Sequence, residues 1–378
     1  MKSPKRPVPR KQSKQKEVVG RIREAILNGS YPAGSRLPNQ IELAQQLQVS
    51  GFTLHRALDQ LASEGFIEKR PKFGTRVAGD LPHLNNIALV FPHDPSAGAY
   101  YSKHFQTLSQ AATAWQRETG RNVITFFGMD QRTDSKDRNR LLEDVAAHRL
   151  AGIVFSSPPF ELENSAILEE PGIPRVCISN GPYSADVPAV GYDGLSFFDS
   201  ALSSLAAQGR KRVACLLVPG MAGLESYLFR AAARLGITSP PHWQLTLAPD
   251  AGEGARNVVR LLMHGPASER PDGLIISDDN LVEHAQAGLI ASGVNIPDDV
   301  MVIEHCNFPW PRSALSTCRL GFNSHDIFRA CVDVIDRQRR GEEVPGLTLI
   351  SAVFEEDLPA KRKSEATSEK AFRLNRPV

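Results

Sequence analysis

The chain has 378 residues, 41% of them hydrophobic and 23% charged, which is ordinary for a globular protein with more than one domain. No apolar run reaches the roughly eighteen residues that cross a bilayer, and no apolar segment follows the basic N-terminus as in a secretory signal. The five cysteines are scattered without a CxxC pair. This pattern favours reduced thiols in the cytoplasm over a disulfide framework or a zinc site.

The overall charge of +2 conceals an asymmetry along the chain. Residues 1–80 contain 15 Lys and Arg against 7 Asp and Glu, and residues 359–378 contain 6 against 2, so the span between them has a net charge of −10. A basic head on an acidic body favours a polyanion as the partner of the head. The basic C-terminal run is also compatible with a solvated tail that has no partner.

The spacing of apolar residues predicts three helices in the head. A helix is expected over residues 16–27 and a shorter one over residues 39–47. Ser50 is a good N-cap for a third helix, and two short strands around residues 71–74 complete a hairpin wing. The result is a winged helix-turn-helix, whose third helix fits the major groove of DNA. The third helix should bury Leu54, Ala57, Leu58 and Leu61 and expose Phe52, His55, Arg56 and Asp59.

The same stretch resembles the DNA-binding domain of the GntR family. The likeness rests on "G-x-x-x-x-G-x-x-LP" (Gly29 to Pro38), "ELA" (Glu42 to Ala44), "VS-x-x-T" (Val49 to Thr53), "AL-x-x-L-x-x-EG" (Ala57 to Gly65) and "G-T-x-V" (Gly74 to Val77). It covers about sixty residues and nearly every structural position of the domain. The resemblance implies a regulator that binds double-stranded DNA.

The departures from the family pattern lie where bases are read. The resemblance implies arginines at three positions, which here hold Ile41, Gly51 and His55. Each arginine that binds guanine with two hydrogen bonds contributes about 1–3 kcal/mol of base discrimination. Because these arginines are missing, the operator sequence should differ from that of other family members, binding should be weaker, or both. Base-edge candidates are therefore Thr53, His55 and Arg56, with Phe52 against a thymine methyl. Phosphate candidates are Asn39, Gln40, Ser50, Lys72, Gly74, Thr75 and Arg76.

Two of these residues have a purely structural alternative. Phe52 is equally suited to pack against the wing. Arg56 could instead form a salt bridge with Asp59 or Glu64. Either alternative would withdraw the side chain from DNA.

Beyond a polar linker, the body alternates short apolar runs with amphipathic segments. Such alternation predicts parallel sheets with right-handed crossovers, and two successive series predict two lobes of α/β class. The expected divisions are a basic disordered tail (1–11), the winged helix-turn-helix domain (12–78), the linker (79–86), the two-lobed domain (87–357) and a basic tail (358–378). Within the two-lobed domain, we expect one lobe from about 87–187 and 308–340, and the other from about 188–307 and 341–357.

The body resembles the sensor domain of the LacI/GalR repressors, which has the fold of periplasmic binding proteins. The runs that carry this likeness are "AGIVFSSP", "GIPRVCIS", "VGYDGLSFFDSALSSLAAQGRKRVACL", "RPDGLIISDD" and "GLIASGVNIPDDVMVIEH". "SALSTCRLGFNSHDIFRACVDVIDRQRRGEEVP" is similar to the closing helix of that family. The resemblance implies a small-molecule effector bound between the lobes, at the carboxyl ends of the strands.

The predicted effector site departs from the family in three places. An acidic residue is replaced by Ser179, a glycine–aromatic–aspartate run by Glu304 to Cys306, and an arginine by Leu224. These changes predict a less polar ligand than a sugar, or none. The candidate effector-binding residues are His93, Asp94, Ser156, Ser179, Asn180, Tyr192, Asp278, Asp279 and Asn307.

The sequence contains no signature of catalysis. It has no Walker-type loop, HExxH, GxSxG or metal-spaced His/Cys cluster, so we expect no enzyme activity, cofactor or metal. We predict a cytoplasmic transcriptional repressor that binds a two-fold operator as a homodimer, without membrane contact. Two alternatives remain: a constitutive DNA-binding protein whose body only dimerises, and a small-molecule binding protein with a vestigial head.

Overall fold

The computed structural model describes residues 14–70, 74–95, 102–129, 135–219, 224–312 and 315–358. It divides the chain into two compact units. The first unit consists of the chain up to Gly191 together with Ser324–Ile350. The second consists of Tyr192–Asn323 together with the segment from Ser351. From the sequence, we expect the chain to pass from one lobe to the other near residues 187, 307 and 340. In the structure it does so after residues 191, 323 and 350, so the second and third expected positions lie ten or more residues too early.

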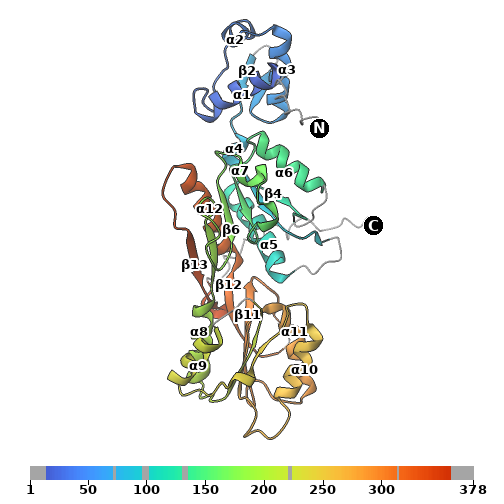
Figure 1. Ribbon diagram of the computed structural model, residues 1–378, viewed down its shortest axis with the longest axis vertical. Helices are drawn as coiled ribbons and strands as arrows, with labels where there is room; N and C mark the ends of the chain where they lie inside the picture. The colour runs from blue at the N-terminus through green and yellow to red at the C-terminus, as the bar shows by residue number, and fades with distance from the viewer. Residues whose placement is uncertain are drawn as a thin grey trace, which may run out of the picture. The chain divides into compact units, whose positions relative to one another are not determined.

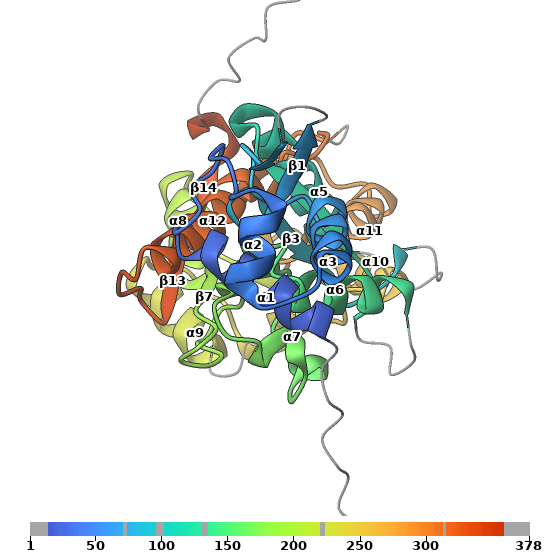
Figure 2. The same ribbon diagram turned by 90° about the horizontal axis from the view of Figure 1, so that it is seen from above.

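The head contains three helices and a two-stranded wing (Figure 1). Its elements are α1 (Lys14–Leu27), α2 (Gln40–Leu47), α3 (Gly51–Ser63), β1 (Ile67–Arg70) and β2 (Gly74–Val77). The two strands are antiparallel, with Ile67 opposite Val77. Figure 2 looks onto α1, α2 and α3 together. The predicted winged helix-turn-helix is therefore present in full, apart from the tip of the wing, which lies outside the described residues.

The core of the head forms because α3 buries one apolar stripe. Leu54, Ala57, Leu58 and Leu61 are each at most 1% exposed, as their spacing predicts. They pack with Ile22 and other side chains of α1, and with Phe66 before the wing. Fully burying a leucine-sized side chain contributes about 1.5–3 kcal/mol, so this stripe fixes α3 firmly on the head.

A one-turn helix, α4 (Pro82–Asn85), follows the head. Leu81, immediately before it, is 3% exposed and belongs to the core of the head. The segment predicted as a linker is thus ordered at both ends, because Asn86 already begins the first strand of lobe 1.

Lobe 1, which lies in the first compact unit, has a six-stranded sheet in the order β13-β7-β6-β5-β3-β4. The pairs β3–β4, β3–β5, β5–β6 and β6–β7 are all parallel. The strands are β3 (Asn86–Val90), β4 (Asn122–Phe126), β5 (Gly152–Phe155), β6 (Arg175–Ile178), β7 (Ala189–Asp193) and β13 (Leu347–Ser351). The helices are α5 (Lys103–Thr119), α6 (Lys136–Ala146), α7 (Ala166–Glu169) and α12 (Ser324–Arg339), with the 3₁₀ turn η2 (Phe160–Leu162).

Lobe 2, the second compact unit, has a sheet in the order β14-β12-β11-β10-β8-β9, with α8 and α9 on one side and α10 and α11 on the other (Figure 1). All pairs are parallel except β12–β14. The strands are β8 (Val213–Leu217), β9 (Gln244–Thr246), β10 (Gly273–Ile276), β11 (Met301–Phe308), β12 (Cys318–Asn323) and β14 (Val353–Phe354). The helices are α8 (Gly194–Ala207), α9 (Leu224–Arg234), α10 (Gly252–Leu262) and α11 (Asp279–Ala291), with 3₁₀ turns η3 (Pro241–Trp243) and η4 (Glu355–Asp357).

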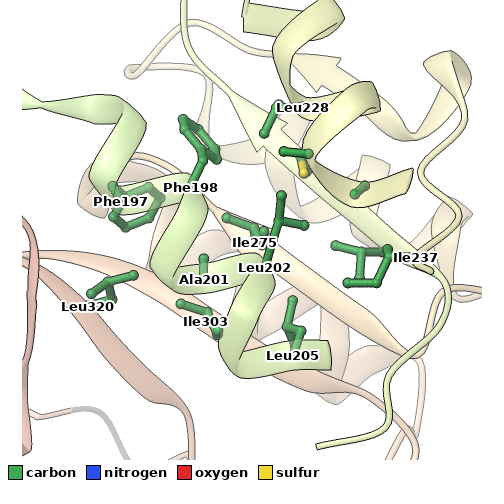
Figure 3. Close-up of a cluster of buried hydrophobic side chains, with 14 of the residues drawn as sticks. Phe197, Phe198, Ala201, Leu202, Leu205, Leu228, Ile237, Ile275, Ile303 and Leu320 are labelled. Carbon is green, nitrogen blue, oxygen red and sulfur yellow. The ribbon is translucent and has the colours of Figure 1, made fainter. Parts of the chain in front are cut away.

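One face of the lobe 2 sheet is covered by α8. Leu202 and Leu205 of this helix point toward Ile275 of β10 and Ile303 of β11 (Figure 3). All four side chains are at most 1% exposed. The mixed α/β class with two parallel sheets, predicted from the alternation of apolar runs, is confirmed.

Candidate DNA-binding interface and effector-binding residues

The third helix of the head is capped at its first turn. Ser50 Oγ accepts a hydrogen bond from the Thr53 amide at 3.2 Å and lies 2.9 Å from Thr53 Oγ1. The predicted N-cap is therefore present, and both hydroxyls already interact with each other. Because the inward stripe of α3 is fixed in the core, its exposed side chains Phe52, His55 and Arg56 project from a rigid helix.

Neither nearby carboxylate takes up the charge of Arg56. Glu64 accepts a hydrogen bond from Arg23 Nη2 at 2.6 Å. Asp59 is paired with Lys69 of the wing, and its Oδ2 lies 3.5 Å from His55 Nε2. The guanidinium of Arg56 lies instead 6.0 Å from the centre of the Phe52 ring. The salt-bridge alternative for Arg56 is thus absent from the structure.

Phe52 is 73% exposed, so it does not pack against the wing. On α2, Ile41 is 74% exposed. Both stand where the family likeness implies base-reading residues or their neighbours. Large apolar side chains in such positions are suited to thymine methyl groups, which are the apolar feature of the major groove.

Asn39 is engaged in a capping box at the start of α2. Its Oδ1 accepts from the amides of Ile41 and Glu42, both at 3.0 Å, and Glu42 Oε2 accepts from the Asn39 amide at 3.2 Å. The side-chain oxygen predicted to face phosphate therefore serves the helix. Gln40 is exposed on the first turn of α2.

In the wing, Gly74 has φ of +83° and a Cβ there would lie 3.1 Å from Arg36 Nη2. Glycine is required at this position both by the left-handed backbone and by the arginine beside it. Arg76 is exposed and donates to the Gly34 carbonyl at 3.4 Å, and Thr75 is half-buried. Lys72 lies outside the described residues.

The predicted effector residues of lobe 1 follow three neighbouring strands. His93 and Asp94 follow β3, Ser156 follows β5, and Ser179 and Asn180 follow β6. Because these strands are parallel, all five residues lie at the carboxyl edge of one sheet. Ser156 Oγ is buried and has no hydrogen-bond partner among the described residues.

The predicted effector residues of lobe 2 are engaged within the lobe. Asp278 caps α11 by accepting from the Asn280 amide at 2.9 Å. Asp279 Oδ2 accepts from both the backbone amide and Nδ2 of Asn307, at 3.1 and 2.9 Å. The Tyr192 ring lies 4.8 Å from that of Phe322. These four residues have contacts that stabilise the lobe.

A buried charge network in lobe 2 was not predicted. Arg319 of β12 lies beside Glu304 of β11, with Nε 4.0 Å from Oε1, and it donates to Glu355 at 2.9 Å. Glu304 accepts from Gln286 at 2.7 Å. Arg319 and Glu304 are 7% and 3% exposed. The available signal was a single charged residue inside each of the apolar runs "MVIEH" and "TCRLGF".

The described residues contain no group of three or more metal-ligating side chains and no helix that is long and apolar enough to cross a membrane. All five cysteines are free thiols. Burial raises the pKa of Cys215 and of Cys306 to about 12. Thiols with such pKa values remain protonated near neutral pH and are weak nucleophiles.

The head and the body each match a known protein family. Residues 14–77 match the family of bacterial regulatory proteins of the gntR type, and residues 202–349 match the periplasmic binding protein-like domain. The arabinose metabolism transcriptional repressor of Halalkalibacterium halodurans is 22% identical over 95% of this chain and 99% of its own length. The GntR regulator of Pseudomonas aeruginosa is 25% identical over 72% of this chain and 80% of its own length.

Solved structures give the same fold for the body. A LacI-family regulatory protein from Chloroflexus aggregans superposes with a TM-score of 0.57 at 17% identity, covering 72% of this chain and 97% of that one. A putative LacI regulator from Bacillus cereus gives 0.53 at 18% identity, over 71% and 96%. The chain thus joins a GntR-family winged-helix domain to a LacI-like, periplasmic-binding-protein-like domain, and it is a transcriptional regulator of this combined type.

Proposed function

We propose that this regulator is a repressor that binds a two-fold DNA operator as a homodimer and that a small molecule bound between the two lobes changes its affinity for the operator. The observation that carries the DNA-binding part is the outer face of α3. There a capped, rigid helix presents Arg56, which has no carboxylate partner among the described residues, beside the exposed Phe52. The repressor names of relatives that align along most of the chain support the sign of regulation.

Arg56 and Phe52 would lie in the major groove, with His55 and Thr53 beside them. Arginine donates two parallel hydrogen bonds to guanine, and the phenyl ring contacts a thymine methyl. The amino end of α2 and the wing residues Thr75 and Arg76 would contact phosphates, which position the protein without reading sequence. A dimer would repeat this arrangement on two half-sites.

The test is selection of DNA from a random duplex library by the full-length protein near physiological salt. The proposal expects an inverted repeat whose affinity falls about tenfold or more for Arg56→Ala. Arg56→Lys is the matched control, because it keeps the positive charge and loses the paired donors. If both variants select the same sequence as the wild-type protein with unchanged affinity, α3 does not read bases through Arg56.

The effector would meet lobe 1 at the carboxyl edge of its sheet. Ser156, Ser179 and Asn180 offer hydroxyl and amide groups there, and Ser156 Oγ has spare hydrogen-bonding capacity in the described structure. Such groups suit a small molecule with hydroxyl or amide functions. Because relatives carry arabinose metabolism in their names, arabinose is the first compound to test, although the replaced residues predict a ligand less polar than a sugar.

Coupling between effector and DNA would be a difference in operator affinity between two arrangements of the lobes. The measurement is operator affinity with and without a saturating compound from a metabolite panel that begins with arabinose. A change of less than about twofold for every compound that stabilises the protein would contradict the coupling.

A second candidate function is constitutive DNA binding, with a body that only dimerises. The observation in its favour is that Asp278, Asp279 and Asn307 already form hydrogen bonds within lobe 2. Thermal unfolding in the presence of the panel separates the two functions, since an effector that binds only the folded state must raise the unfolding temperature. A vestigial head is disfavoured by its buried core, its helix caps and the paired strands of its wing.

A further inference from the structure

A cavity of about 540 Å³ lies beside the linker helix α4 in the first compact unit. Its wall contains α4, the segments that precede β5 and β6, and the end of α12. Since β3, β5 and β6 are parallel and α4 precedes β3, this is the amino edge of the lobe 1 sheet. The predicted effector residues of lobe 1 lie at the opposite, carboxyl edge, so the cavity is a separate place in the molecule.

The polar part of the wall has groups that carry a positive charge or none. It contains the imidazoles of His83 and His148, the guanidinium of Arg339 and the amide of Gln338. Apolar side chains form much of the remaining wall, among them Leu27, Leu84, Leu150 and Ile173.

The positive charge of Arg339 exceeds the negative charge beside it. The carboxylate near it is Asp336, 3.9 Å from Nη1. That carboxylate already accepts two hydrogen bonds from Arg121, at 2.6 and 3.0 Å. Arg339 also donates to the Leu84 carbonyl at 3.3 Å, so the same guanidinium holds the linker helix. The imidazole Nε2 of His148 lies 3.2 Å from a carboxylate oxygen of Glu170.

His83 contributes a buried ring nitrogen to the wall of the cavity. Its ring stacks on Phe66 of the head core, with 5.9 Å between centroids, and its Nδ1 is buried without a hydrogen-bond partner among the described residues. Burial, and then the positive charges of Arg339 and His148, lower the pKa of His83 to about 4. Burial disfavours a charge of either sign here, so it is the guanidinium of Arg339, not the pKa of His83, that would attract an anion.

We propose that this cavity binds a small organic anion, a carboxylate attached to a compact apolar body, and that it is a second ligand site of the regulator. The carboxylate faces Arg339, whose paired donors match it, with the two imidazoles beside it. The apolar body lies against the leucines and Ile173. A cavity of this size is typical of small-molecule sites.

The position of the site connects it to DNA binding. Leu81, just before α4, is part of the head core, while Arg339 and His148 belong to lobe 1. An anion that contacts Arg339 and His83 at once adds a second connection to the hydrogen bond by which Arg339 already holds the linker helix on lobe 1. The orientational freedom of the head then decreases, and this freedom affects how two heads meet two half-sites.

The first test is calorimetric titration of the full-length protein with benzoate at pH 7 and low salt, with benzamide as the neutral compound of the same shape. Benzoate should bind one site per chain, and benzamide about tenfold more weakly or not at all. Arg339→Gln should weaken benzoate binding by about tenfold. Arg329→Gln is the matched control, because Arg329 is on the same helix with a side chain 60% exposed and it does not line the cavity.

A second variant covers the case in which Arg339→Gln loosens the linker helix. His83→Phe keeps the ring on Phe66 and removes both nitrogens. In the wild-type protein near pH 5, benzoate should raise the pKa of His83 and draw a proton onto it, which titrations in buffers of different ionisation enthalpy detect. This proton uptake should fall in the variant. The proposal is overturned by no saturable benzoate binding, by equal affinity for benzamide, by equal effects of the two arginine variants, or by unchanged proton uptake.

Discussion

The head and lobe 2 use charged side chains in opposite ways. On α3 of the head, Arg56 is exposed, and no carboxylate in the described part of the chain pairs with it. In lobe 2, Arg319 is buried and contacts Glu355, Cys306 and the Trp310 carbonyl. The first arginine is available to an outside partner, and the second is committed to the fold.

This difference separates two kinds of substitution. Removing an exposed, unpaired group should affect binding and leave the stability of the fold nearly unchanged. Removing a buried, hydrogen-bonded charge should affect stability first, whatever the ligand. A substitution therefore shows whether a residue serves binding or stability.

The largest effect is expected for Arg319→Ala. The substitution removes the positive charge that offsets the buried carboxylate of Glu304 and leaves a cavity in lobe 2. Breaking a buried ion pair from one side costs about 3–5 kcal/mol. The free energy of unfolding, measured by urea denaturation, should therefore fall by this amount.

Arg312→Ala is the matched control for Arg319→Ala. Arg312 pairs with the same Glu355 at 2.6 Å, but its side chain is 72% exposed. An exposed pair contributes about 0–1 kcal/mol, so this variant should be nearly as stable as the wild-type protein. Equal losses from the two substitutions would show that the buried network has no special role in lobe 2.

The next prediction concerns Asp279, which was chosen from the sequence as an effector contact. Asp279→Ala removes the acceptor for two donors of Asn307 and should cost about 1–3 kcal/mol of stability in the absence of any ligand. Ser156→Ala removes a hydroxyl without a partner in the described structure and should leave the midpoint of urea unfolding unchanged. If Ser156→Ala lowered stability more than Asp279→Ala, Asp279 would serve ligand binding rather than the stability of lobe 2.

Much of the head could be predicted from the sequence, because its structure depends on local spacing. The apolar stripe of α3 and its N-cap at Ser50 follow from the helical period and from the chemistry of one hydroxyl. The partners of the charges did not follow. Glu64 lies eight residues from Arg56 in the sequence, yet its partner is Arg23, 41 residues away on α1. Such pairs depend on how the helices pack.

In the body, the ends of the strands could be predicted from the sequence, but the hydrogen-bond partners of the residues at those ends could not. The apolar runs place Asp279 and Asn307 after or at the end of their strands, but their mutual hydrogen bonds join residues 28 apart. The register of β11 and β12 sets Glu304 opposite Arg319, and no local pattern encodes that register. The same limit explains why the chain passes between the lobes later than expected at two places, because an apolar run does not reveal which sheet it joins.

A smaller effect is expected from His83 as the pH falls. Its pKa is about 4 in the folded protein and near 6.5 when unfolded, so between these values only the unfolded state is protonated. Stability should therefore decrease as the pH falls from 6.5 towards 4, by about 1 kcal/mol between pH 7 and 5 after allowance for solvent screening of this half-buried ring. His83→Phe should remove that part of the decrease. Thermal unfolding of both proteins at pH 7 and 5 measures it, and identical pH dependence would contradict it.

The smallest effect is expected at Asp59, the acidic residue on the outer face of α3. Its side chain pairs with Lys69 and lies near His55, and hydrogen bonding to Lys69 lowers the pKa of this exposed carboxyl. Asp59→Asn removes a negative charge that repels phosphates and releases Lys69 toward the DNA. Affinity for duplex DNA should therefore increase by about two- to fivefold, with a steeper salt dependence, and the unfolding temperature should hardly change. The control is Glu143→Gln, which removes one exposed negative charge from α6 of lobe 1. If both variants bind DNA equally more tightly, the gain reflects net charge alone, and α3 has no special place in the interface.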